Sequence, residues 1–282
     1  MRGLTRLADS EESRERPSPE LDLLTVAAAA VLVYAITLIV HELAHALSAM
    51  AAGGEVSLIS STDTRGDWSQ LSERDVVLVG LSGSAVNALL ALIGWLVARR
   101  HMGRPTTVTL LAWLFFAVNA WMPVSYLVAS PVFDVGDWAT IVDAFPNRGP
   151  LRASLAATGL FTAGLLWKET VPSLARLVGN GSAVDRRLRA ERLVRVAWGA
   201  GGSIAVVAAL FSPLALSWAL PIAAGSTLGT TWPMLPAADR VGQHPVPGAP
   251  LSVSRSWTII VLGAVVGMVL AGVFGPGVDL GG

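Results

Sequence analysis

The sequence predicts an all-α integral membrane protein, a polytopic helical bundle of about six transmembrane helices. Hydrophobic residues make up 53% of the 282 residues and charged residues only 14%, whereas soluble domains carry about 25% charged residues. A chain of this size cannot bury so much apolar surface in one core, but a bilayer accepts it as an apolar solvent. The apolar residues also gather in long runs, as membrane-spanning helices require.

The lengths of these runs set the expected number of spans, because a helix needs about 20 apolar residues to cross the hydrocarbon core. The fourth run is short. The fifth is too long for one straight span and holds Pro213 and Pro221, so we expect it to break into a helix and a re-entrant segment, with seven segments as the alternative count. The Gly- and Pro-rich stretch 223–250 is predicted to be a loop. The six runs fall at 23–51, 76–98, 106–130, 151–167, 195–222 and 257–275.

Three regions follow from this pattern. Residues 1–20 mix basic and acidic side chains and lack the apolar run of a signal peptide, so we expect a disordered polar tail. Residues 21–145 hold the first three spans, and residues 146–282 form a C-terminal membrane region with about three more. In the last span, Gly263 and Gly267 form a Gly-x-x-x-Gly pair that permits close approach of another helix, for example in a homo-oligomer, although so glycine-rich a chain also produces such a pair by chance.

Charge indicates the orientation and excludes some partners. Fourteen of the 20 Lys and Arg residues fall on the face that carries the N-terminal tail. This excess predicts that both ends of the chain lie on the cytoplasmic side of a cell membrane. The formal net charge is zero, so nothing indicates a nucleic-acid partner. There is no cysteine, so any metal must be held by His, Asp, Glu or backbone groups.

One motif carries chemistry. His41-Glu42-Leu43-Ala44-His45 lies late in the first span, directly after a stretch without charges. Residues four apart share a helix face, so His41 and His45 can hold one zinc ion, while Glu42 lies at the edge of that face as a general base. Ionisable side chains inside a membrane are costly and usually functional, although a cluster at the end of a helix is the simpler alternative.

A catalytic zinc site needs a third protein ligand. Asp134 and Asp137 follow the third span, which runs in the same direction as the first, so both carboxylates reach the membrane face where the first span ends. Either carboxylate can serve as this ligand. If neither binds, Glu55 and Asp63 in the first loop are the next candidates.

These motifs resemble the site-2 protease family of intramembrane zinc metalloproteases, in the form of a divergent prokaryotic-type member. The resemblance covers about residues 30–145. The run Gly83-Ser84-Ala85-Val86-Asn87 stands where the family has a Gly-Pro-x-x-Asn-like element, with Ser84 in place of proline. Asn119 and Pro123 resemble the Asn and Pro of the family's later helix at a looser spacing, and Pro131-Val132-Phe133-Asp134 resembles its Pro-x-Leu-Asp. The run Gly136-Asp137-Trp138 resembles a variant form of that motif in divergent members, and for this reason we favour Asp137 over Asp134 as the third ligand.

The resemblance implies a zinc-dependent endopeptidase that hydrolyses peptide bonds of membrane-protein substrates. It implies that Asn87 or Asn119 positions the substrate or the oxyanion, and that the site faces the cytoplasm, whereas the charge count places it outside. The alternative is a non-proteolytic membrane metal-binding protein, either a transporter or a regulatory pseudoprotease. A transporter should line several spans with ionisable residues, and a pseudoprotease should have lost Glu42 or a His, so both alternatives fit less well.

The polar segment from Glu55 to Asp75 follows the motif directly. It is either a solvated loop or a site where a short strand, around Val56 to Ile59, pairs with an extended substrate.

Overall fold

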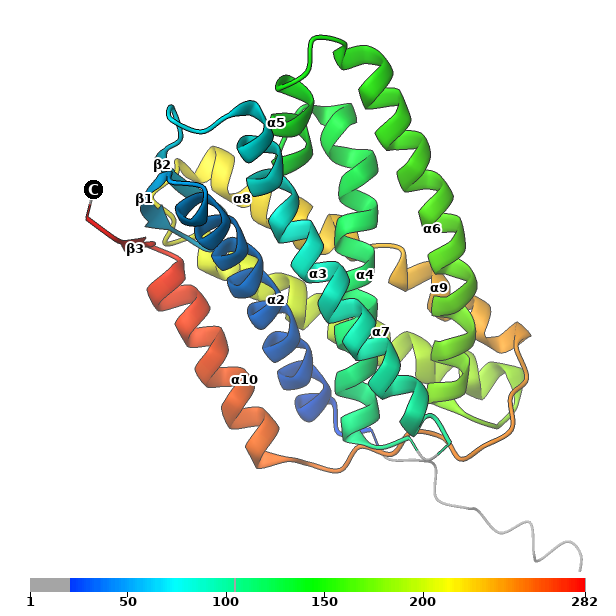
Figure 1. Cartoon of the computed structure of the whole chain (residues 1–282). Helices are drawn as coiled ribbons and strands as arrows, with labels where there is room; N and C mark the ends of the chain where they lie inside the picture. The colour runs from blue at the N-terminus through cyan, green and yellow to red at the C-terminus, as the bar shows by residue number, and fades with distance from the viewer. Residues whose placement is uncertain (1–20, 104, 282) are drawn as a thin grey trace, which may run out of the picture.

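The computed structural model describes residues 21–103 and 105–281, so the predicted N-terminal tail lies outside the described residues. Within that range the chain is a helical bundle with one small sheet (Figure 1). In chain order the elements are α2 (Leu23–Ala51), β1 (Glu55–Ile59), β2 (Thr64–Asp67), α3 (Glu73–His101), α4 (Thr107–Phe133), α5 (Asp137–Asp143), α6 (Arg148–Val178), α7 (Ala183–Ala209), α8 (Leu216–Ala224), the π-helix η1 (Gly225–Gly229), α9 (Met234–Arg240), the 3-10 helix η2 (Val241–Gln243), α10 (Trp257–Val269), the π-helix η3 (Leu270–Phe274) and β3 (Val278–Asp279).

Five helical segments among the described residues are long and apolar enough to cross a membrane, which indicates a multi-pass membrane protein. They are α2, α3, α4, α7 and the continuous helix Trp257–Phe274 formed by α10 and η3. The predicted count of six is not confirmed. The fourth apolar run lies inside α6, whose 31 residues are long enough but whose ends are polar, so it does not qualify by composition.

Short polar side chains start several of these helices. Asp22 accepts a hydrogen bond from the backbone N–H of Thr25, and Ser72, Ser182 and Ser256 cap α3, α7 and α10 in the same way. Such caps satisfy N–H groups that have no partner inside the helix. The helix boundaries are therefore fixed by local chemistry as well as by the edges of the apolar runs.

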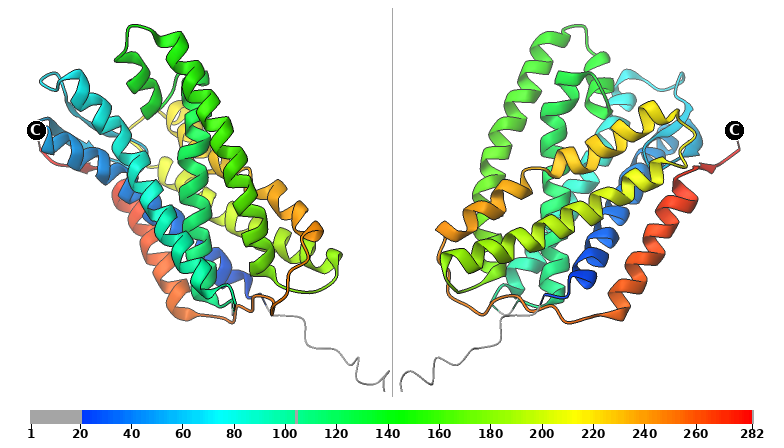
Figure 2. Two further views of the ribbon diagram at one scale, coloured as in Figure 1. Left: turned by 45° about the vertical axis from the view of Figure 1, so that its right-hand side comes forward. Right: turned by 180° about the vertical axis from the view of Figure 1, so that it is seen from behind.

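The fifth apolar run breaks as expected, because α7 ends at Ala209 and α8 begins at Leu216, with Pro213 in the gap. The predicted loop at 223–250 is wrong over much of its length, since η1 and α9 occupy it. Packing explains the difference: Met234, Ala237 and Ala238 are buried, and such burial outweighs a weak helix propensity. Seen from behind, α8 lies alongside α7, and both cross the bundle obliquely (Figure 2).

Helix α2 lies at the centre of the bundle, against α3, α7 and α10. Gly263 and Gly267 face α2, and a Cβ on either would press on Ala28 or Val31. The Gly-x-x-x-Gly pair therefore serves contact within the chain, and this face is not available to a second copy.

Strand β1 is the middle strand of an antiparallel sheet in the order β2-β1-β3. Because β1 follows α2, strand β3 lies at the far end of α2 from Leu21, which bridges Val253. The two ends of the described chain thus lie on opposite sides of a spanning helix. This differs from the prediction that both lie on one face, because the five candidate spans are an odd number.

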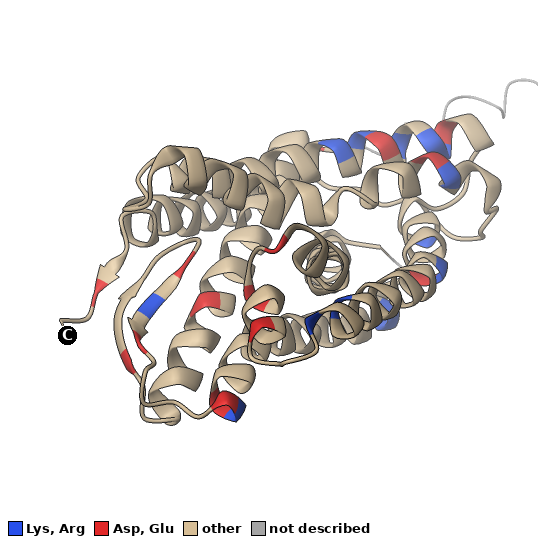
Figure 3. Cartoon of the chain, turned by 90° about the horizontal axis from the view of Figure 1, so that it is seen from above, with Lys and Arg blue, Asp and Glu red and all other residues tan. Residues whose placement is uncertain are grey.

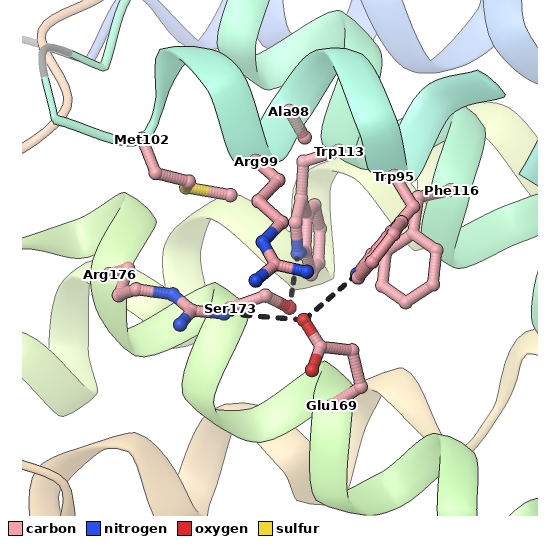
Figure 4. A pocket seen from close by; sticks show the side chains of 9 residues that line it. All are labelled: Trp95, Ala98, Arg99, Met102, Trp113, Phe116, Glu169, Ser173 and Arg176. Atoms are coloured by element: carbon pink, nitrogen blue, oxygen red, sulfur yellow. Dashed lines mark hydrogen bonds and ion pairs between the residues drawn. The ribbon is translucent and has the colours of Figure 1, made fainter. Parts of the chain in front are cut away.

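Basic residues gather on the part of the molecule away from the sheet, mainly on α6, α7 and the end of α3 (Figure 3). Some of them join a small polar network between α3, α4 and α6 (Figure 4). There Trp95 and Arg176 both donate to Glu169 Oε1, at 3.0 and 3.2 Å, and the Arg99 guanidinium lies over the Trp95 ring. The space left among these side chains is about 10 Å³.

Candidate metal centre

The two histidines of the motif lie one turn apart near the end of α2, with His45 buried and His41 partly buried. Their Nε2 atoms are 3.1 Å apart, and the two rings meet edge to face. The predicted sharing of one helix face is thus confirmed.

Asp137 completes the group from the other side of the cavity. Its Oδ2 lies 3.2 Å from His41 Nε2 and 3.4 Å from His45 Nε2. Burial raises the pKa of the Asp137 carboxyl, but the neighbouring imidazoles outweigh this effect and hold the pKa below its usual range. The carboxylate is therefore ionised at neutral pH.

The turn between α4 and α5 decides which aspartate reaches the histidines. Asp134 ends α4 in the left-handed conformation (φ 59°), and Gly136 also has a positive φ (75°). Ser130 holds the turn by donating to the Val135 carbonyl and accepting from the Ala139 N–H. Asp134 consequently points away and pairs with Arg152, so the structure does not bring this alternative ligand to the site.

The spacing of the three ligand atoms fits a tetrahedral ion. Zinc lies about 2.0–2.1 Å from nitrogen and oxygen ligands, which separates two ligands of a tetrahedron by about 3.3–3.4 Å. The observed separations are 3.1, 3.2 and 3.4 Å. Two imidazole nitrogens and one carboxylate oxygen converge here, and atoms of these kinds are zinc ligands. Among the described residues, this is the group of His, Asp and Glu side chains that can hold a metal.

One face of α3 supports the histidines, through Val79, Gly83 and Asn87, each four residues from the next. The Val79 carbonyl lies 2.7 Å from His45 Nδ1, so this nitrogen donates its proton there and leaves Nε2 with a lone pair. A Cβ on Gly83 would lie 2.5 Å from His45 Nε2 and 2.7 Å from His41 Nε2, so only glycine fits. The Asn87 amide lies 3.2 Å from His41 Nδ1.

Glu42 is buried beside the histidines and lines the same cavity. The Thr64 hydroxyl, at the start of β2, lies 3.0 Å from Glu42 Oε2 and donates to it. The hairpin after α2 thus orients the predicted general base. Thr64 was not identified from the sequence, because nothing in the pattern of the loop shows that it folds back onto α2.

The cavity that holds these groups has a volume of about 920 Å³. Helices α2, α3 and α4 and the loop before β2 form most of its walls. The C-terminal half supplies another wall, through α8 and η1, which includes Trp218, Ile222 and Ser226. The position of this wall beside the ligands was also missed. Most of α8 falls in the fifth apolar run, which was expected to break into a re-entrant segment, and η1 falls in the stretch predicted to be a loop.

The remaining candidates lie apart from the ligands. Asn119 is fully buried in the bundle, where it donates to Thr37 Oγ1 at 2.9 Å, and it does not line the cavity. Asp63 lines the cavity wall but pairs with Arg65. Glu55 opens β1 and is exposed.

No family model, curated protein or solved structure matches the chain. The resemblance to site-2 proteases therefore stays a prediction, and the function has to be argued from the geometry.

Proposed function

We propose that the protein is a membrane-embedded zinc endopeptidase that cleaves membrane-protein substrates, related to the site-2 proteases. The observation that carries the proposal is the convergence of His41, His45 and Asp137 at tetrahedral spacing, with Glu42 buried next to them. Three protein ligands leave one position open, which is the pattern of catalytic rather than structural zinc. When bound, zinc polarises the substrate carbonyl and makes water more acidic.

The role of Glu42 follows from its surroundings. Thr64 holds Oε2, which leaves Oε1 to take a proton from the attacking water and to pass it to the leaving amine. A residue that served only as packing would not need a carboxylate at this depth, where ionisable groups are costly. Glu42 therefore favours hydrolysis over simple metal storage.

The sheet suggests how a substrate chain is held. The expected strand at Val56–Ile59 exists as part of β1, but β1 is flanked by β2 and β3, so it has no free edge. The outer edge nearest the site belongs to β2, whose Thr64 contacts Glu42. We infer that an extended substrate segment pairs with β2, which would bring its scissile bond to the general base.

The test compares the wild type with Glu42→Gln. This change keeps size but removes the proton acceptor, and loss of a general base lowers rates by about 10²–10⁴. Membranes from cells that express each form are labelled at new protein N-termini and compared by mass spectrometry. We expect a set of membrane-protein fragments in the wild type only, with equal zinc in both purified proteins.

The matched control is Glu169→Gln, which changes a glutamate of the distant polar network. It should give the wild-type fragments. Identical fragments from wild type and Glu42→Gln, with zinc bound in both, would rule out the peptidase and favour the non-proteolytic metal-binding alternative.

A further inference from the structure

We propose that Asn87 is a positioning residue that acts through His41, by accepting the Nδ1 proton of His41 with its side-chain oxygen. This inference rests on the zinc site of the proposed function, but not on peptidase activity. It differs from the substrate-positioning role that the family resemblance implies for Asn87.

The geometry around Asn87 is specific. The side chain is 1% exposed, and its Nδ2 lies 3.2 Å from His41 Nδ1. Its Oδ1 has no hydrogen-bond partner among the described residues. The two ends of a carboxamide have nearly the same shape, so their assignment follows from the hydrogen-bond network. Exchanging them by a half-turn of the amide places Oδ1 on His41 Nδ1 and turns Nδ2 to the place that Oδ1 leaves.

The choice between these orientations decides whether a metal can bind. With Nδ2 facing His41, the imidazole proton must sit on Nε2 and points at His45 and Asp137, into the place of the ion. With Oδ1 facing His41, the proton sits on Nδ1 and Nε2 presents a lone pair. Metal-binding histidines usually donate their other N–H to an oxygen in this way.

His45 already shows the same arrangement, since its Nδ1 donates to the Val79 carbonyl. Val79 and Asn87 lie on one face of α3, each four residues from Gly83, so a single helix supplies an oxygen to each imidazole. The side-chain oxygen of Asn87 is then used by His41, while the two N–H donors of Nδ2 face the place that Oδ1 leaves.

The test measures the affinity of purified protein for Zn²⁺ by competition with a chelator. Asn87→Leu should weaken binding by about 10–100-fold, the usual effect of losing a partner of this kind. Asn87→Asp keeps an oxygen acceptor and should bind at least as tightly as the wild type. The matched control is Asn119→Leu, another buried asparagine that bonds α2 from a neighbouring helix but lies outside the cavity. It should bind Zn²⁺ with unchanged affinity.

Nitrogen NMR of zinc-loaded wild-type protein labelled in histidine gives a second readout that needs no variant. We expect the His41 proton on Nδ1, and a proton on Nε2 would overturn the proposal. Wild-type affinity in Asn87→Leu, or equal losses in Asn87→Leu and Asn119→Leu, would overturn it as well. If the wild type itself binds no Zn²⁺, the zinc site of the proposed function fails together with this inference, whereas an inactive protein that binds Zn²⁺ refutes the peptidase alone.

Discussion

Two polar clusters lie among the helices of this apolar bundle. They differ in whether the hydrogen-bond donors and acceptors within each cluster are matched. In the network of Trp95, Glu169 and Arg176, two donors meet one carboxylate, and the remaining space is about 10 Å³ (Figure 4). In the group of His41, His45 and Asp137, two imidazole nitrogens and a carboxylate oxygen meet one another beside a cavity of about 920 Å³.

We propose that the difference separates a structural cluster from a functional one. In the first, the two donors meet a carboxylate oxygen, and the carboxylate pairs with the Arg176 guanidinium. In the second, Nδ1 of His45 lies against the Val79 carbonyl, so Nε2 is the nitrogen that faces His41 and Asp137 and is available to the proposed metal.

The largest effect is expected from a substitution that puts a side chain between the proposed metal ligands. Gly83→Ala puts a methyl group 2.5 Å from His45 Nε2 and 2.7 Å from His41 Nε2, so the two imidazole rings must move apart to admit it. We expect zinc to fall from about one per chain to near zero, as in His45→Ala, because two ligands cannot hold a catalytic zinc. Metal content of purified protein measures this. Gly164→Ala is the control, since a Cβ there meets open space, and zinc retained in Gly83→Ala would show that the ion does not lie between α2 and α3.

A second comparison sharpens the assignment of the third ligand. Asp137→Asn should weaken zinc binding strongly, because a neutral amide oxygen is a poor zinc ligand. The loss should exceed the about 10–100-fold expected when a residue that only hydrogen-bonds a ligand is removed. Asp134→Asn should leave zinc affinity unchanged, since Asp134 pairs with Arg152. Chelator competition distinguishes the two. Equal affinities in both variants would move the third ligand elsewhere.

The smallest effect is expected in the closed cluster. Glu169→Gln loses the ion pair with Arg176 but keeps an acceptor for Trp95, and Glu169 is 39% exposed. We expect the free energy of unfolding in mixed micelles to fall by about 1 kcal/mol or less, with zinc content unchanged. A loss of zinc in this variant would mean that the two clusters are not independent.

Much of this contrast was visible in the sequence, because it depends on local spacing. The run 23–51 matches α2 residue for residue, and the four-residue interval of His41 and His45 fixes their common face. Proximity of Asp137 followed from the parallel first and third spans. The orientation of Asp134 did not, because a left-handed residue and Gly136 redirect the chain within one turn.

Other parts of the site depend on contacts between distant segments. Thr64 reaches Glu42 only because the hairpin folds back on α2, and η1 lines the cavity only because α8 packs along α7. Neither the hairpin nor η1 shows a periodic pattern of apolar residues from which these contacts could be predicted. The Gly- and Pro-rich composition of 223–250 even favours the wrong structure, since propensity is a weak guide where burial decides.

The position of β3 in the sheet sets a time order for making the protein. Strands β1 and β2 follow α2 directly in the chain, whereas β3, which pairs with β1, follows α10. The sheet that carries Thr64 is therefore completed only after α10 has been made. A chain that stalls before this point has Glu42 and Thr64 but not the complete sheet, so we expect the proposed activity only once α10 and β3 are in place.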